Sequence, residues 1–233
     1  MKKWQDVCKF ISLRIIALYI FEKMTQTIQI LDQNFILHPS GTLFWKEQAT
    51  LLISDVHLGK ITHFRKFGAA VPQKAIYKNF DLLDSTIAFF NPEVVCFLGD
   101  LFHSSLNREW ELFEKWIKNS DLKYILVRGN HDIISPLRYE RIGIQVVTEL
   151  TSEKFLLTHH PEERQGYFNF SGHIHPAIKL RGKGKQSLRL PCFFKTQDQM
   201  ILPAFGKFTG TYTMNKKDTD EVFAIADNTI LKI

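Results

Sequence analysis

Short apolar runs separated by polar turns dominate the chain from Thr27 onward. Ile28–Leu31 and Phe35–Leu37, followed by the turn residues 39–41, predict a β-hairpin. Further along, continuous apolar runs that end in polar residues are typical of strands buried on both faces. These runs are Thr50–Ser54, Val94–Leu98 and Leu122–Val127.

Two helical patterns separate these predicted strands. The first runs from Pro72 to Phe90 and repeats apolar side chains at spacings of three and four, with proline at its start. The second runs from Asn107 to Lys118 and repeats the same spacing. Because strand and helix alternate in this order, the pattern predicts an α/β fold with a parallel core.

The second half of the chain has a different pattern, with short strand-like runs and few helical stretches. These runs are residues 145–147, 155–158, 167–170, 177–180, 187–194 and 222–225. They predict a second, mostly antiparallel sheet in the same domain. Since no repeat or linker interrupts the sequence after Met24, we expect one domain over residues 24–233.

Residues 1–23 do not fit this pattern. Phe10–Phe21 is apolar and follows two lysines, but Arg14 interrupts it, and it is too short to span a bilayer. No small-residue cleavage site follows, as a signal peptide requires. We therefore expect an N-terminal extension outside the fold, with Met24 as the functional start and no stable membrane insertion. A helix lying on a membrane surface is the alternative.

Composition excludes several classes of protein. Of the 233 residues, 45% are hydrophobic and 23% are charged, which argues against disorder, collagen-like repeats and coiled coils. Cys8, Cys96 and Cys192 lie far apart without CxxC spacing, so neither a disulfide scaffold nor a thiolate zinc site is expected. This favours a reducing, cytoplasmic location. The formal net charge of +6 is only weak evidence for a nucleic-acid partner.

Most of the nine histidines lie in short polar clusters that follow the strand-like runs. The clusters are Asp55–His57, Gly99–His103, Gly129–Asp132, His159–Pro161 and Gly172–Pro176. Each cluster alone is also good turn chemistry. In an open α/β sheet, however, ligands bind at the carboxyl ends of the strands. Five such clusters in series therefore predict one shared site.

The ligand types in these clusters indicate a metal centre. Carboxylate, amide and imidazole groups without thiolate suit Mn, Fe or Zn. Asp55 with His57, and His173 with His175, are spaced two apart and share a face while the chain stays extended. The ligands suffice for two ions, and such pairs lie roughly 3.5–4 Å apart with a bridging carboxylate. Asp100, the carboxylate of its cluster, is the candidate bridge.

In this order, Asp-x-His, Gly-Asp, Gly-Asn-His-Asp, a single His and Gly-His-x-His resemble the motifs of the calcineurin-like metallophosphoesterase superfamily. Residues 52–60, Phe64-Arg65, Gly68 with Pro72, and the clusters at 99–103 and 172–176 are similar to the bacterial ligase-associated DNA damage response metallophosphoesterases, a group of endonucleases. The resemblance implies a four-layer α/β/β/α sandwich with two mixed sheets.

The resemblance also implies two metal sites. One would hold Asp55, His57, Asp100 and His175, and the other would hold Asp100, Asn130, His159 and His173. The pattern calls for a single histidine where this chain has His159-His160. We expect His159, directly after the strand, to be the ligand, and His160 to lie beside it. His131 is the implied general acid, held by Asp55 or another carboxylate. His103 would orient a bridging ligand or contact the substrate.

The expected activity is hydrolysis of a phosphoester with two divalent ions, most simply Mn, with Fe or Zn as alternatives. Two dications lower the pKa of a shared water, so that hydroxide attacks phosphorus while Asn130 helps to hold the phosphate. His131 then protonates the departing alkoxide.

We predict a phosphodiesterase or nuclease that acts on nucleic acid in DNA repair, with an ATP-dependent DNA ligase and a DEXH-type helicase as partners by resemblance. A phosphomonoesterase or protein phosphatase on the same metal centre is the first alternative. A non-catalytic scaffold is the second, and the presence of every expected ligand argues against it.

Basic residues near the motifs allow two interpretations. Lys60, His63, Arg65 and Lys66 line the cleft for a phosphate chain, or form an ordinary solvated loop. Arg128 contacts substrate or forms a salt bridge at a strand edge. Residues 179–189 carry cations without an acid, which predicts a flexible basic hairpin that grips a nucleic-acid backbone or stays solvated. These cations are Lys179, Arg181, Lys183, Lys185 and Arg189.

Overall fold

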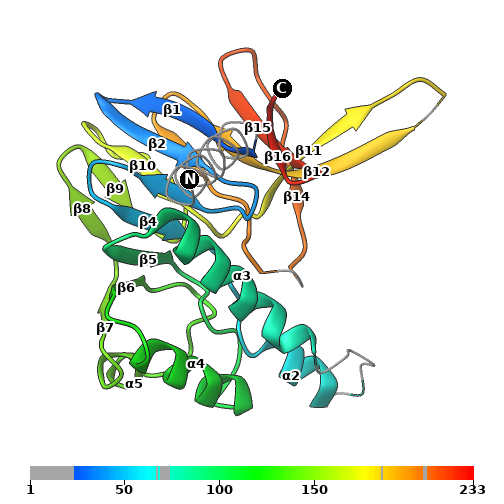
Figure 1. Cartoon of the computed structure of the whole chain (residues 1–233). Coiled ribbons are helices and arrows are strands. Elements are labelled where there is room, and N and C mark those ends of the chain that lie inside the picture. Colours follow the sequence, from blue (N-terminus) through cyan, green and yellow to red (C-terminus); the bar gives the residue numbers. More distant parts are fainter. Residues whose placement is uncertain (1–23, 67, 69–73, 185, 207–208) are drawn as a thin grey trace, which may run out of the picture.

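The computed structural model describes residues 24–66, 68, 74–184, 186–206 and 209–233. Two mixed β-sheets pack against each other, and helices cover one of them (Figure 1). This confirms the predicted α/β class with two mixed sheets. The predicted N-terminal extension, Pro72 and Lys185 lie outside the described residues.

The first sheet has the strand order β1-β2-β3-β4-β5-β6-β7. Its strands are β1 (Gln26–Ile30), β2 (Gln33–Leu37), β3 (Leu43–Trp45), β4 (Thr50–Ile53), β5 (Val94–Leu98), β6 (Lys123–Val127) and β7 (Ile144–Val147). Strands β1 to β4 pair antiparallel, and β4 to β7 pair parallel. The predicted hairpin and the three predicted buried strands are therefore confirmed.

One strand assignment was wrong. Residues 145–147 belong to β7 of the first sheet, parallel to β6, and not to the second sheet. The helix that makes this crossover is α5 (Pro136–Glu140), which has only five residues. A helix this short shows too little of the 3.6-residue period to be recognised from apolar spacing.

All four described helices pack on one face of the first sheet. They are α2 (Lys60–Lys66), α3 (Ala75–Phe90), α4 (Arg108–Lys118) and α5. Asn107 caps α4, because its side chain accepts the backbone N–H of Glu109 at 2.8 Å. Within the described ranges no helix covers the second sheet. These ranges therefore form one layer of helices and two sheets, which are three of the four layers that the resemblance implies.

The second sheet has nine strands in the order β14-β11-β12-β13-β10-β9-β8, with β15 joining β12 to β16. They are β8 (Leu150–Ser152), β9 (Phe155–Leu157), β10 (Phe168–Ser171), β11 (Pro176–Arg181), β12 (Ser187–Lys195), β13 (Gln199–Ile201), β14 (Tyr212–Thr213), β15 (Glu221–Ala226) and β16 (Thr229–Lys232). Parallel pairing of β9 with β10, β10 with β13 and β11 with β14 interrupts an otherwise antiparallel sheet.

The alternation of side chains along β5 explains why the two sheets stack. Val95 and Phe97 face the helices, whereas Cys96 and Leu98 face the second sheet. Strand β5 is thus buried on both faces, and Cys96 is a core residue as predicted. Gly99 and Asp100 directly follow β5, whose last residue, Leu98, packs between the two sheets. No helix among the described residues has the length and apolar character needed to cross a membrane.

Candidate metal centre

The five polar clusters of the sequence meet at one edge of the two sheets. Asp55 follows β4, Asp100 follows β5 and Asn130 follows β6, which are neighbouring parallel strands. His159 follows β9, and His173 follows β10, its parallel neighbour. The carboxyl ends of both sets of strands lie together, so the clusters converge as the sequence predicted.

Asp55, His57 and His175 form one group of converging side chains. Their ligand atoms lie within 4.8 Å of one another. His175 Nε2 lies 3.2 Å from Asp55 Oδ1 and 3.4 Å from His57 Nε2. His175 Nδ1 lies 3.0 Å from the carbonyl oxygen of Gly210, which accepts a hydrogen bond. The Nδ1 proton therefore points away, and Nε2 offers its lone pair to the group.

A second group surrounds His159. Its Nε2 lies 2.9 Å from Asn130 Oδ1 and 3.2 Å from His173 Nδ1. Its Nδ1 lies 2.9 Å from the carbonyl oxygen of Leu98, so Nδ1 carries the proton and Nε2 faces the group. The sequence motifs that are far apart in the chain thus place their nitrogen and oxygen atoms around a common point.

Asp100 touches both groups. Its Oδ1 lies 3.4 Å from His159 Nε2, and its Oδ2 lies 3.9 Å from His57 Nε2. The side chain is only 2% exposed. Among the described carboxylates of the cluster, Asp100 therefore occupies the position that a bridging ligand needs.

The doubled histidine places both rings near His173. The His160 ring centroid lies 4.0 Å from that of His173, and ligand atoms of all three histidines lie within 4.8 Å of one another. His159 is buried and also reaches Asp100 and Asn130, whereas His160 is exposed at the margin. The geometry thus agrees with the expectation that His159 is the ligand and that His160 lies beside it.

The backbone at the centre is not extended, which corrects one step of the sequence argument. Asp55, His57, Asp100, His173 and His175 all have positive φ, between 50° and 66°. We expected residues spaced two apart to reach one cleft from an extended chain, and that was wrong. Left-handed φ is sparsely populated by residues other than glycine, costs free energy, and concentrates at functional sites.

Glycines in the motifs leave space for the candidate ligands. A Cβ atom at Gly129 would overlap the Asp100 carboxylate, and one at Gly172 would overlap the Asp55 carboxylate. At Gly99, which has a φ of +82°, a Cβ would overlap the His159 ring. The glycine of each motif is therefore needed because a ligand side chain packs directly against its backbone.

The electrostatics of the centre suit a cation. Burial, together with the nearby Lys60 and imidazoles, lowers the pKa of His57 to about 2, so its ring stays neutral. Burial also lowers the pKa of His173. For His175, burial would lower the pKa, but the adjacent Asp55 carboxylate raises it above its ordinary value. Neutral imidazole is the form that binds metal.

Asp55 is fully buried, and its Oδ1 accepts no hydrogen bond from the described residues, because its neighbour at 3.2 Å, His175 Nε2, carries no proton while His175 Nδ1 donates to Gly210. An unpaired buried carboxylate oxygen is costly unless a cation faces it. Together with the inward-facing nitrogens of His159 and His175, this unpaired oxygen shows that the residues fit a divalent metal ion.

Three more histidines border the centre. The ring centroid of His131 lies 4.5 Å from that of His103 and 5.8 Å from that of His57. The backbone N–H of His131 donates to Asp100 Oδ1 at 2.9 Å, so Asp100 fixes the backbone of residue 131. Asp55 instead accepts the backbone N–H of His173 at 2.9 Å. His63 lies farther out, with its ring centroid 6.5 Å from that of His103.

The predicted basic residues differ in position. Lys60 is partly buried at the start of α2, and burial lowers its pKa. Arg65 and Lys66 are exposed on the same helix. Arg128 donates from Nε to the backbone carbonyl oxygen of Asp132 at 3.3 Å, which is not the salt bridge that one interpretation predicted.

Two buried carboxylates support the loops, and the sequence did not indicate this role for either of them, although Asp132 belongs to a recognised cluster. Glu109 is 1% exposed and accepts hydrogen bonds from the backbone N–H groups of Gly59 and Thr62, each at 2.8 Å. Asp132 accepts from the backbone N–H groups of Phe102 at 3.0 Å and Gly129 at 2.8 Å, and burial raises its pKa to about 6. In the sequence, Glu109 is an ordinary helix-start residue, and nothing in the Gly129–Asp132 cluster shows that Asp132 supports the backbone.

Comparisons with known proteins show which family and which solved structures the chain is similar to. The sequence model of the calcineurin-like phosphoesterase family matches residues 49–179. The crystal structure of Pseudomonas putida nuclease MPE superposes with a TM-score of 0.75 and 28% sequence identity, covering 90% of this chain and 100% of that chain. A predicted phosphoesterase from Streptococcus pneumoniae shares 14% identity over 79% of this chain and 95% of its own, but its TM-score of 0.31 carries no argument. No curated protein sequence matches this chain.

Proposed function

The chain belongs to the calcineurin-like phosphoesterase family, whose members are metal-dependent phosphoester hydrolases, and on this premise we propose that it is a phosphodiesterase that acts on nucleic acid through two metal ions. The observation that carries this proposal is the position of Asp100 between two groups of converging ligands. The similarity to the Pseudomonas putida nuclease supports nucleic acid as the substrate class.

We assign the two metal positions by the two groups. The first would be held by Asp55, His57, Asp100 and His175, and the second by Asp100, Asn130, His159 and His173. Imidazole and carboxylate oxygen suit Mn best in our proposal, with Fe or Zn as alternatives. When bound, the ions would act as Lewis acids and lower the pKa of a water, so that hydroxide is present at neutral pH.

The chain itself supplies the proton that the leaving group needs. His131 is exposed and outside both ligand groups, which leaves its ring available to protonate the departing alkoxide. The backbone N–H of His131 donates to Asp100, so the distance between the proposed general acid and the proposed bridging carboxylate is fixed. Asn130 directs its amide oxygen at His159, and we propose that its amide nitrogen donates to a phosphate oxygen. His103, beside His131, would orient the substrate.

A role in DNA repair beside an ATP-dependent DNA ligase and a DEXH-type helicase is the finer part of the proposal. It is supported by the similarity of residues 52–60, 99–103 and 172–176 to the ligase-associated group. An endonuclease activity belongs to the same part of the proposal.

The test is turnover by metal-stripped protein after restoration with Mn. A chromogenic phosphodiester and the matching monoester would be compared for the unmodified protein, Asp100→Ala and the control Asp81→Ala, which changes an exposed aspartate on α3. We expect preference for the diester, lost in Asp100→Ala and retained in Asp81→Ala. Monoester preference would instead indicate a phosphatase. No turnover of either substrate by protein shown to carry metal would contradict the enzymatic proposal and favour a scaffold.

A further inference from the structure

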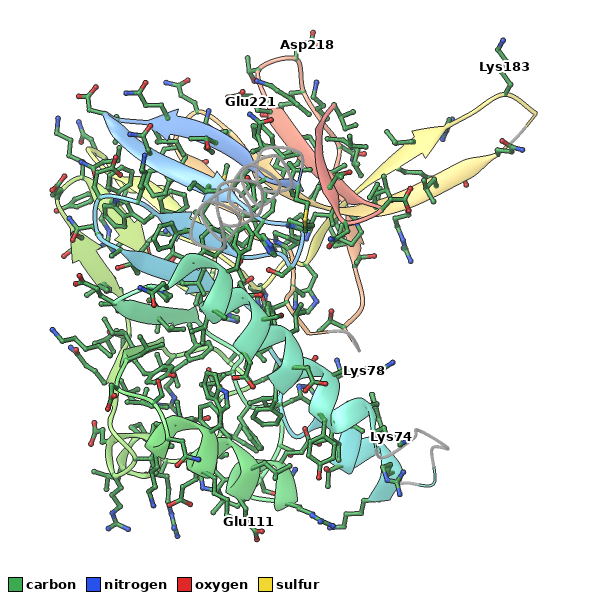
Figure 2. The ribbon with its side chains drawn as sticks, viewed as in Figure 1. Lys74, Lys78, Glu111, Lys183, Asp218 and Glu221 are labelled. Atoms are coloured by element: carbon green, nitrogen blue, oxygen red, sulfur yellow. The ribbon has the colours of Figure 1, made fainter. Side chains whose placement is uncertain are left out.

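The hairpin formed by β11 and β12 projects from the body of the protein (Figure 1). Lys183 lies at its far end (Figure 2). We call residues 177–191 the β11–β12 arm. Its two strands pair antiparallel from Ala177 opposite Pro191 to Arg181 opposite Ser187. The arm therefore has a regular register, and the face on which each side chain lies follows from it.

The two faces of the arm differ in chemistry. Ile178 pairs with Leu190 and Leu180 with Leu188, which makes one face apolar. Ile178 is buried in a cluster on the outer side of the second sheet, and Leu180 and Leu190 pack against it. The apolar face is thus attached to the body at its base, which fixes the direction of the opposite face.

The opposite face is basic. Lys179 lies directly across from Arg189, and Arg181 follows two residues after Lys179 on the same face. Like charges directly across a strand pair destabilise a sheet. Lys179 and Arg189 therefore repel each other across the strand pair, and an acidic residue at either position would have removed this repulsion.

These cations have no carboxylate partner in the described part of the chain. Lys179, Arg181, Lys183 and Arg189 are all exposed and form no ion pair there. Nearer the body, by contrast, Lys195 pairs with Glu221 at 2.7 Å, and Lys232 pairs with the same carboxylate. Lys195 and Lys232 near the body are thus neutralised by Glu221, whereas the described cations of the arm form no ion pair.

The basic face lies on the side of the second sheet that faces the first sheet. Phe193 of β12 lies on the same face of the strand as Arg189, and Phe193 packs in the core between the two sheets. Strand β11 starts directly after His175. Because a strand rises about 3.3 Å per residue, Lys179 and Arg181 lie about 13 and 20 Å along the chain from His175. They are too distant to contact the phosphorus that reacts.

We propose that the β11–β12 arm is a second binding site for the phosphate backbone of nucleic acid, which holds phosphates that flank the bond cleaved at the metal centre. This inference rests on the proposed function. A narrow two-stranded ribbon fits the major groove of a duplex, and the two cations of β11, Lys179 and Arg181, lie about 6.6 Å apart along the strand. Unpaired cations in such a row release counterions when they meet phosphates, which is the main source of sequence-independent affinity.

The experiment removes the three cations of the basic face and compares a matched control. Lys179→Gln, Arg181→Gln and Arg189→Gln are combined in the arm variant. The control combines Lys46→Gln, Lys123→Gln and Lys154→Gln, exposed residues at the amino ends of β4, β6 and β9, opposite the metal centre. Both variants lose three positive charges, and circular dichroism checks that both are folded.

Binding to a labelled phosphorothioate DNA, single-stranded or duplex, is measured by fluorescence anisotropy over a salt series. We expect the slope of log affinity against log salt to fall by about 2–3 in the arm variant, because each lost phosphate contact contributes about 0.7–0.9. The control should change far less. Lys183→Gln alone should lower the slope by about 0.7–0.9. Hydrolysis of a small chromogenic diester, which does not reach the arm, should match that of the unmodified protein.

Equal salt slopes in the arm variant and the control would overturn the inference. So would selective loss of binding to phosphatidylserine vesicles instead of DNA, which would assign the arm to a lipid surface. The two proposals fail separately. Diester turnover without any DNA binding would reject the arm and keep the phosphodiesterase. A salt slope that depends on the arm in protein without turnover would keep the arm and reject the proposed reaction.

Discussion

The metal centre and the β11–β12 arm gather polar side chains in opposite ways. At the centre, Asp55 and Asp100 are buried, their backbones have positive φ, and motif glycines pack against ligand side chains. On the arm, the cations are exposed on a regular antiparallel ladder. The centre thus depends on shape and strain, whereas the arm depends on charge alone. Substitutions at the centre should change turnover and stability, and those on the arm should change affinity and its salt dependence.

The largest effect is expected for Asp100→Asn. The amide keeps the shape of the side chain but removes the charge that both ligand groups contact. Metal ions contribute several kcal/mol to the stabilisation of a transition state, so we expect kcat to fall by roughly 10³-fold or more. Steady-state kinetics with Mn would measure this, and Asp81→Asn on the exposed face of α3 is the control. Near-normal kcat would remove Asp100 from the centre.

His131→Asn tests whether His131 acts as a general acid and not as a metal ligand. General acid catalysis contributes about 10²–10⁴-fold when the leaving group needs a proton. We therefore expect a loss of that order with a dinucleotide substrate and a much smaller loss with a nitrophenyl diester, whose leaving group needs no proton. Bound metal, measured by elemental analysis, should be unchanged. Equal losses with both substrates would assign His131 to another role.

The same glycine substitution in the two regions gives the sharpest contrast. Gly172→Ala places a Cβ against the Asp55 carboxylate and Ser54, and overpacking of this kind costs about 1–3 kcal/mol. On the arm, a Cβ at Gly182 meets only Gln186, at 3.6 Å, which is ordinary contact. Gly182→Ala should therefore be neutral. Denaturant unfolding of both variants tests this, and equal stabilities would show that the centre is less tightly packed than the structure indicates.

The smallest effect is expected for Glu109→Gln. Its carboxylate holds the start of α2, because one oxygen accepts from Gly59 and the other from Thr62. Glutamine keeps only one accepting oxygen, so one backbone N–H loses its hydrogen bond at a cost of about 1 kcal/mol. We also expect KM for the diester to rise more than kcat falls, because α2 carries Lys60 beside the centre. Glu111→Gln, at the exposed Glu111 labelled in Figure 2, is the matched control on α4.

Much of this arrangement was predictable from the sequence. The buried strands β4, β5 and β6 were visible as continuous apolar runs, and polar clusters at their ends indicated a shared site. That prediction needed only the rule that parallel strands end at the same edge of a sheet. The residues of the candidate metal centre were thus identified before their distances were known.

The remainder depends on long-range contacts that a pattern of apolar positions does not encode. Periodicity indicates which face a residue occupies but not its φ, so the left-handed backbone at Asp55 and His175 was missed. The supporting role of Glu109 depends on α4 meeting α2, which only the folded chain determines. For the same reason, β7 was assigned to the wrong sheet, since five helical residues are too few to signal a crossover.

Anomalous scattering from crystals grown with Mn would show whether two metal ions share Asp100. We predict two anomalous peaks, one within reach of Asp55, His57 and His175, and the other within reach of Asn130, His159 and His173, with Asp100 between them. A single peak held by His159, His160 and His173, with Asp100 outside its coordination sphere, would show that Asp100 does not bridge two ions.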